Sequence, residues 1–76
     1  MGNGITNLYE AEKKGEFTVI AAPDTGLLES MGIRAGTQIR LQNRYAMGGP
    51  VLLRVEDAYS VAVGKDIAEQ IEVAAV

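Results

Sequence analysis

The stretch LLESMGIRAGTQIRLQNR (residues 27–44) decides the fold, because it passes from a short helical segment through a turn into a strand. Leu27 and Met31 are four residues apart, so on a helix they would lie on one face and point to the core together. Gly32 follows where a helix commonly ends in a left-handed residue. Gly36 suits a tight turn that needs positive φ. The stretch therefore predicts a helix of about two turns followed by a turn and a strand.

Residues 37–44 alternate between apolar and polar side chains, as a half-buried strand does. Ile39 and Leu41 would face the core. On the opposite side the alternation places Gln38, Arg40, Gln42 and Arg44. The strand thus carries two arginines on the face that the core does not use.

The segments on either side are likewise short strands and helical turns that end at turn or capping residues. Before the helix, residues 16–22 are rich in β-formers, Pro23 ends that strand, and Asp24 or Thr25 is a suitable helix N-cap. After residue 44 we expect a loop at 45–50, strands at 51–56, 59–63 and 71–74, and one helical turn at 64–69. Five short strands indicate a small barrel or sandwich, and closure of a barrel would remove most exposed edges.

The expected core follows from the inward side of each strand and from the helix. Phe17 and Val19 share one face of the first strand, with Ile20 on the other, and we expect the core to include Phe17 or its neighbours Val19 and Ile20. The other expected core residues are Leu28, Ile33, Ile39, Leu41, Val51, Leu53, Val55, Val61, Val63, Ile67, Ile71 and Val73.

The composition excludes several classes of protein. Seventy-six residues make one domain, and 47% apolar content is too high for disorder. The chain has no cysteine and no histidine, which removes disulfides, thiolate metal sites and the usual general base. A net charge of −3 disfavours nucleic-acid binding through bulk positive charge. The start of the chain lacks the pattern of a signal peptide, so a cytosolic location is expected.

Motifs that carry catalysis are also missing. The segments GIRAG and MGGP match neither glycine-rich phosphate loop, and their glycines serve as turn residues. Ser30 and Ser60 have no lysine or histidine expected beside them. Tyr45 and Tyr59 are the aromatic residues expected to be partly exposed, but four scattered rings do not make a stacking platform. We therefore expect no catalytic residue, no resident cofactor and no metal site.

Three segments in order, LLESMGIRAGTQIRL, YAMGGPVLLRV and YSVAVGKDIAEQIEV, resemble the FeoA family, ferrous iron transport protein A. The likeness covers residues 15–73. The residues that match the family pattern in order and spacing are Leu28, Gly32, Ile33, Gly36, Pro50, Ala68, Ile71 and Val73.

The resemblance implies a mainly β fold, a small SH3-like five-stranded barrel with one short helix between strands one and two. On this basis residues 1–14 form a partly flexible lead-in and residues 15–76 form the barrel. It also implies a small cytosolic accessory protein of ferrous iron uptake, whose partner is the cytoplasmic G-protein portion of the membrane transporter FeoB. A similar domain ends the metal-dependent repressors of the diphtheria-toxin type. Neither nucleic acid nor direct membrane insertion is expected.

Two other functions stay open. One is a nucleic-acid-binding SH3-like module, for which Arg34, Arg40, Arg44 and Arg54 would supply local positive charge. The other is a metal-responsive regulatory domain. With only oxygen ligands available, such a domain would suit Mg²⁺ or Ca²⁺ better than it would select Fe²⁺.

A surface hypothesis follows from pairing the second and third strands symmetrically across the 44–50 loop. Leu41 would then meet Leu53, Gln42 would meet Leu52, and Arg40 would meet Arg54. Like charges directly opposite are unfavourable, although Glu56 on the diagonal would relieve part of the repulsion. The functional interpretation is a partner-binding surface, and the alternative is a tolerated mixed-charge face. The residues of the predicted surface are Arg40, Arg44, Tyr45, Leu52 and Arg54.

Overall fold

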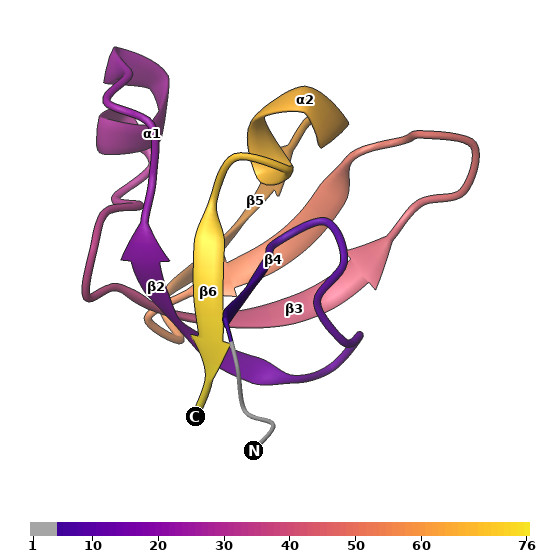
Figure 1. The fold of residues 1–76 in the computed structure, drawn as a ribbon, viewed down its shortest axis with the longest axis horizontal. Coiled ribbons are helices and arrows are strands. Elements are labelled where there is room, and N and C mark those ends of the chain that lie inside the picture. The colour runs from indigo at the N-terminus through magenta and orange to yellow at the C-terminus, as the bar shows by residue number, and fades with distance from the viewer. Residues whose placement is uncertain (1–4) are drawn as a thin grey trace.

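The computed structural model describes residues 5–76 and is mainly β (Figure 1). In chain order its elements are β1 (Ile5–Asn7), β2 (Glu16–Ala21), α1 (Gly26–Ser30), β3 (Gln38–Arg44), β4 (Val51–Val55), β5 (Tyr59–Val63), α2 (Lys65–Ala68) and β6 (Glu72–Ala75). The five predicted strands are present as β2 to β6, and the predicted helix and helical turn as α1 and α2. The prediction of a small SH3-like β fold is confirmed, with one short strand more than expected.

One antiparallel sheet contains all six strands, in the order β1-β6-β2-β3-β4-β5. The strands curl around a common interior (Figure 1). Within residues 5–76, β1 and β5 stand at opposite ends of the order, so no backbone ladder joins them and the expected closure is not complete. Helix α2 lies between β5 and β6 in the chain, and β6 pairs with β1 and β2 rather than with β5.

The segment before β2 takes a larger part in the fold than its sequence suggests. Ile5 and Thr6 belong to the lead-in that was expected to be partly flexible, but in β1 they pair with Ala74 and Val73 of β6; residues 1–4 lie outside the described part. Just after β1, Leu8 and Ala11 are fully buried in the common core. The proposed division of the chain at residue 14 stays a prediction.

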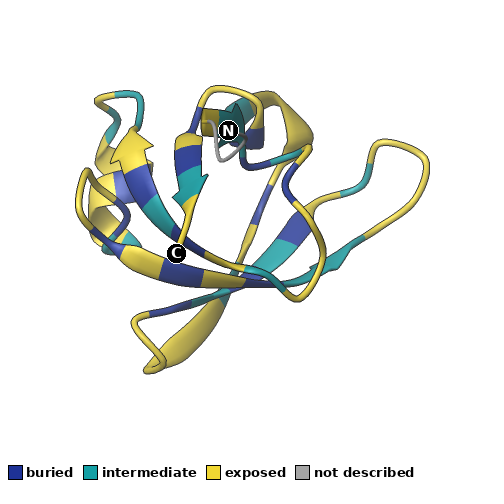
Figure 2. Cartoon of the chain, turned by 60° about the horizontal axis from the view of Figure 1, so that its bottom comes forward, coloured by how far each residue is buried: buried dark blue, intermediate teal, exposed yellow. Residues whose placement is uncertain are grey.

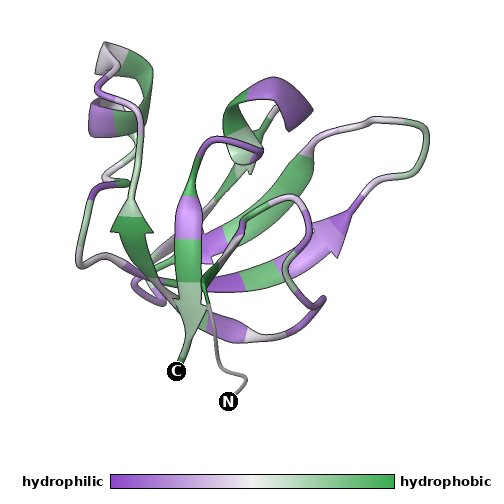
Figure 3. Cartoon of the chain, in the orientation of Figure 1, coloured by the Kyte–Doolittle hydropathy of each residue, from purple (hydrophilic) through white to green (hydrophobic). Residues whose placement is uncertain are grey.

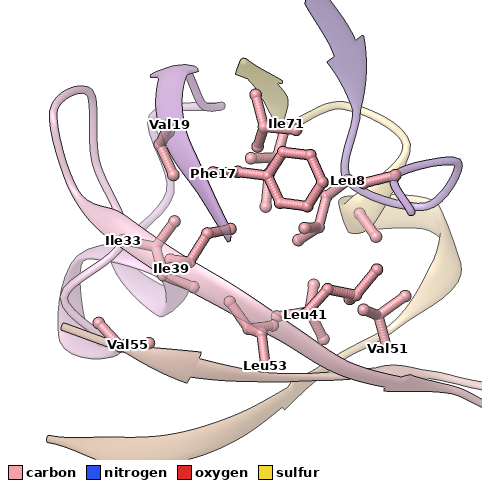
Figure 4. Packing of buried hydrophobic residues seen from close by; sticks show 14 of the residues in the cluster. Leu8, Phe17, Val19, Ile33, Ile39, Leu41, Val51, Leu53, Val55 and Ile71 are labelled. Carbon is pink, nitrogen blue, oxygen red and sulfur yellow. The ribbon is translucent and has the colours of Figure 1, made fainter. Parts of the chain in front are cut away.

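The core fills the interior of the curled sheet (Figure 4). Along β2, β3 and β4 buried residues alternate with more exposed ones (Figure 2), and the buried positions are apolar (Figure 3). Val61 and Ile67 are only partly buried, and Ile20 is 40% exposed because it points away from the interior. The expected core residues that are fully buried are Phe17, Val19, Leu28, Ile33, Ile39, Leu41, Val51, Leu53, Val55, Val63, Ile71 and Val73.

Helix α1 begins and ends as its sequence indicates. The Leu28 N–H donates to the Thr25 hydroxyl at 3.2 Å, which makes Thr25 the N-cap. At the other end, Gly32 has φ +79° and the Ile33 N–H donates back to the Leu28 carbonyl at 2.9 Å, the bond of a Schellman motif. Leu28 and Ile33 are both buried and supply the apolar contact that accompanies this motif.

The prediction that Leu27 faces the core is wrong. Leu27 is 57% exposed, and Met31 is only partly buried. A helix of five residues has room for one inward position, and Leu28 occupies it. Neither helix of residues 5–76 is long and apolar enough to cross a membrane.

The end of α1 is tied to the start of β5 by one side chain. The Tyr59 hydroxyl donates to the Met31 carbonyl at 2.5 Å. Gly32 is required at this point for two reasons, since its φ is positive and a Cβ there would overlap the Tyr59 hydroxyl.

Candidate partner-binding surface

Strands β3 and β4 pair as expected over the core. Ile39 lies opposite Val55 and Leu41 opposite Leu53, with all four side chains inward. Between them, Arg40 lies directly opposite Arg54 on the outer side of the sheet. The predicted opposition of two arginines is therefore confirmed.

Nearer the loop the expected register is wrong. A β-bulge lies between Leu41 and Asn43, so that Asn43 rather than Gln42 lies opposite Leu52. The extra residue on β3 reverses the alternation beyond it. As a consequence Arg44 lies opposite the buried Val51, on the inner side of the sheet.

Arg44 consequently leaves the predicted surface. Its guanidinium donates to the carbonyl of Ala11 at 2.7 Å, and it is half-buried there. This charged hydrogen bond gives Arg44 a structural role, because it joins the end of β3 to the segment after β1 that contributes Leu8 and Ala11 to the core.

Two other predicted residues remain part of the predicted surface. Leu52 is half-buried, between Asn43 on β3 and Ala62 on β5. Tyr45 is the first residue of the loop after β3, and it is 46% exposed. The outer side of β3, β4 and β5 therefore carries Arg40, Leu52 and Arg54, with Tyr45 at its loop end; we call these four residues the outer surface.

Arg40 is compensated by a residue that the sequence did not reveal. Its guanidinium donates to the Glu16 carboxylate at 2.5 Å, and Glu16 lies opposite Arg40 on β2. This hydrogen bond, followed by the charges of Glu16 and Asp57, raises the pKa of Arg40 above its usual value. Arg40 is therefore charged at every pH at which the protein would be studied.

The expected relief of the arginine pair by the charge of Glu56 stays a prediction, and among residues 5–76 the Glu56 carboxylate makes no hydrogen bond to either arginine. The Glu56 carboxylate instead accepts the Gln38 N–H at 3.2 Å, while the Glu56 N–H donates to the Gln38 carbonyl at 2.8 Å. Glu56 thus closes the β4–β5 turn onto the beginning of β3. Its carboxylate stays close enough to contribute negative charge to the same part of the surface.

Arg54 is held against β5 by neutral groups. Its guanidinium donates to the Asp57 carbonyl at 3.2 Å and to the Ser60 hydroxyl at 3.5 Å. The Ser60 hydroxyl donates in turn to the Gln42 side-chain oxygen at 2.8 Å. This chain of bonds spans β3, β4 and β5, and it fixes the orientation of Arg54.

A shallow hollow lies at one end of the outer surface, with a volume of about 160 Å³. The hollow combines one guanidinium with three carboxyl groups. The carboxylates would repel a small anion, so the hollow suits a protein partner that forms ion pairs better than it suits a free anion. Residues 5–76 contain no group of three or more acidic side chains placed to hold a metal ion. The hollow is lined by Glu16, Gln38, Ile39, Arg40, Glu56 and Asp57.

Comparison with known proteins shows the family to which this chain belongs. The FeoA domain model matches residues 6–75. The chain belongs to the FeoA family. The NMR structure of a FeoA-like protein from Clostridium acetobutylicum is similar, with a TM-score of 0.79 and 32% identity over 95% of this chain and 87% of that one. The crystal structure of an iron uptake regulatory protein, FeoA, has a TM-score of 0.85 and 24% identity over 96% and 99% of the two chains.

The same fold also occurs inside larger proteins. A manganese-dependent transcriptional repressor matches all of this chain with a TM-score of 0.85 and 20% identity, but the match spans only 44% of the repressor. At that identity the likeness concerns the fold alone. The sequence has no significant match among curated proteins.

Proposed function

We propose that this protein is a small, non-enzymatic accessory protein of ferrous iron uptake, located in the cytoplasm. We further propose that it binds the cytoplasmic G-protein portion of a FeoB-type membrane transporter through the outer surface. Membership of the FeoA family supports the first part, together with the similarity to a structure described as an iron uptake regulatory protein.

The observation that carries the second part is the placement of Arg40 opposite Arg54, beside the half-buried Leu52. Like charges directly opposite each other on a sheet are unfavourable for folding. Arginine is enriched in protein interfaces and at their hot spots, and apolar side chains fill their centres. The arrangement therefore makes sense as a surface for another protein.

The bonding of the two arginines indicates the chemistry of the partner. The Arg40 guanidinium has five N–H donors, and the described bond to Glu16 engages only part of them. Arg54 is oriented by a backbone carbonyl and a hydroxyl, neither of which neutralises its charge. A partner that presents carboxylates around an apolar side chain would complement this surface.

The test is binding to the transporter's soluble G-protein domain, measured with and without guanine nucleotide. The variant combines Arg40→Gln, Leu52→Ser and Arg54→Gln, because glutamate at residue 40 would repel Glu16. We expect the wild type to bind and the variant to lose roughly tenfold or more in affinity, as when interface hot spots are removed.

The matched control combines Lys13→Gln and Arg34→Gln, which changes the net charge by the same amount away from the outer surface. Both variants are first checked for an unchanged melting curve. If both variants lose affinity equally, general charge explains the interaction. If neither loses affinity, the outer surface is not the interface.

Nucleic acid fits this surface less well, because phosphates that approached Arg40 would also meet Glu16, Glu56 and Asp57. A salt titration of DNA and RNA binding tests this directly. Release of phosphate from GTP by the purified protein, above that of a heat-inactivated sample, would contradict the proposal that it is not an enzyme. A chelator-sensitive shift in melting temperature would indicate a metal-responsive domain instead.

A further inference from the structure

The loop between β3 and β4 (residues 45–50) projects from the body of the molecule (Figure 1). At its tip the Gly49 N–H donates to the Ala46 carbonyl at 3.2 Å, which closes a four-residue turn. The two central residues, Met47 and Gly48, have φ +63° and +76°. Positive φ at both central positions is the requirement of a type I′ turn, for which Asn-Gly is strongly preferred.

Met47 departs from this preference at the most exposed position of the loop. Its side chain is 100% exposed. A methionine in left-handed backbone conformation is strained, and here its apolar side chain gains no burial in return. Nothing in the fold of residues 5–76 therefore accounts for a methionine at this position.

The exposed methionine lies in the loop that joins β3 and β4, the two strands that carry most of the outer surface. Tyr45, two residues earlier, is half-exposed at the loop end of that surface. The whole tip, residues 45–50, contains no charged residue. The same hairpin therefore presents a charged region at Arg40 and Arg54, an apolar region at Leu52 and Tyr45, and an uncharged projecting tip.

We propose that Met47 is the apolar anchor of this surface and inserts into an apolar pocket of the protein that the outer surface binds. The assignment rests on the proposed function, since that protein is the transporter's G-protein domain. A methionine suits such a pocket because its unbranched, polarisable side chain adapts to an irregular apolar wall. The outer surface then sets orientation through charge, and the tip adds buried apolar contact.

Two other occupants of the tip are less suited. A second copy held by the tip alone would bury far less than the roughly 800 Å² per partner of a specific interface. A bilayer with anionic lipids would repel a chain of net charge −3, and one methionine with one tyrosine offers little area for insertion. Insertion of one side chain into a pocket of another protein requires neither a large buried area at the tip nor a net positive charge on this protein.

The experiment uses Met47→Asn, which converts the turn to Asn-Gly. We expect the melting temperature to stay the same or rise, because the turn is improved, while affinity for the transporter domain falls by roughly tenfold or more. Opposite changes in stability and binding exclude misfolding as the cause. Met47→Leu, which keeps an apolar side chain, should retain affinity within about threefold.

Leu27→Ser is the matched control, since it removes an exposed apolar side chain from α1 instead. If wild type and Met47→Asn bind the transporter domain equally, the anchor assignment is overturned while the proposed function stands. If the wild type does not bind at all, both are overturned. Binding of the wild type, but not of Met47→Asn, to vesicles containing anionic lipid would overturn the protein pocket in favour of a membrane contact.

Discussion

Strand β4 is flanked by two turns that share a backbone conformation and differ in what holds them. The turn that leads to β5 has Glu56 and Asp57 at φ +54° and +59°, and the loop that precedes β4 has Met47 and Gly48 in the same region. Glu56 is bonded twice to Gln38 on β3. Among the described residues, the backbone bonds of the 45–50 loop run within the loop itself.

The two turns differ in whether contacts within the fold account for their residues. At the β4–β5 turn, tertiary contacts compensate for unfavourable turn residues. At the projecting loop, no contact among residues 5–76 accounts for Met47, which is fully exposed. We call these the rooted turn and the free turn, and the predictions below test the difference between them.

The largest effect is expected midway between the two turns, at Leu53 on β4. Leu53→Ala removes a fully buried side chain and leaves a cavity, which should cost about 2–5 kcal/mol of unfolding free energy. A domain of this size has roughly 4–11 kcal/mol in total, so chemical denaturation should be followed at low temperature. A loss below about 1 kcal/mol would mean that the core between the turns is loosely packed.

The next largest loss of stability is expected where the start of β5, just after the rooted turn, is bonded to the end of α1. Gly32→Ala forces a Cβ into positive φ and against the Tyr59 hydroxyl, and should cost about 1–2 kcal/mol or more. Tyr59→Phe removes the bond to the Met31 carbonyl and should cost about 0.5–1.5 kcal/mol.

The double variant distinguishes strain from contact. Without the hydroxyl the new Cβ has more room, so Gly32→Ala should cost less in the Tyr59→Phe background than in the wild type. If the two costs simply add in equilibrium denaturation, the backbone conformation of Gly32 accounts for its whole effect.

Much of this fold could be predicted because its signals are local. The Thr25 cap, the left-handed Gly32 and the alternation of β3 each act within a few residues. Strand β1 could not be found in this way, because three residues without an apolar pattern become a strand only by pairing with the distant β6. The role of Leu8 in the core depends on the same pairing.

The candidate site was predictable only where the register of β3 and β4 is regular. A turn centred between Met47 and Gly48 pairs Arg44 with Val51, whereas the core requires Leu41 opposite Leu53. The two registers differ by one residue on β3, and the bulge absorbs the difference. The glycines alone would place the bend at Gly48 and Gly49, whereas the turn is centred one residue earlier, so neither the bulge nor the inward position of Arg44 could be predicted from them.

The sequence contains no local pattern that predicts the ion pair between Glu16 and Arg40. A helix and two turns separate β2 from β3, so no hairpin fixes their register in advance. Only the packed core of residues from both strands decides that Glu16 lies opposite Arg40.

A smaller effect is expected at the rooted turn itself. Asp57→Gly relieves one left-handed residue and leaves the bonds of Glu56 to Gln38 intact, so it should stabilise the protein by about 0.5–1 kcal/mol. Thermal unfolding measures the change. Asp66→Gly in α2 is the control and should act in the opposite direction, since glycine weakens a helix. Destabilisation by Asp57→Gly would mean that the aspartate makes a contact stronger than the strain it carries.

The smallest effect on stability is expected for Arg40→Gln, between the two turns on the outer side. The substitution removes the ion pair with Glu16 but also the opposition to Arg54, and these changes have opposite signs. About half of each ion-pair side chain is exposed (46% and 55%), so solvent screens the pair. We expect a melting temperature indistinguishable from that of the wild type.

The pH dependence follows from the raised pKa of Arg40. A cation whose pKa is raised by folding contributes its full stabilisation at pH values below its unfolded-state pKa, and loses it only as the pH rises through the higher pKa of the folded state. The difference between Arg40→Gln and the wild type should therefore be constant between about pH 6 and pH 9. If unfolding experiments show instead a large or pH-dependent loss, Arg40 is a structural residue like Arg44. The ion pair with Glu16 would then explain the position of Arg40, and the proposed partner would lose one of its supports.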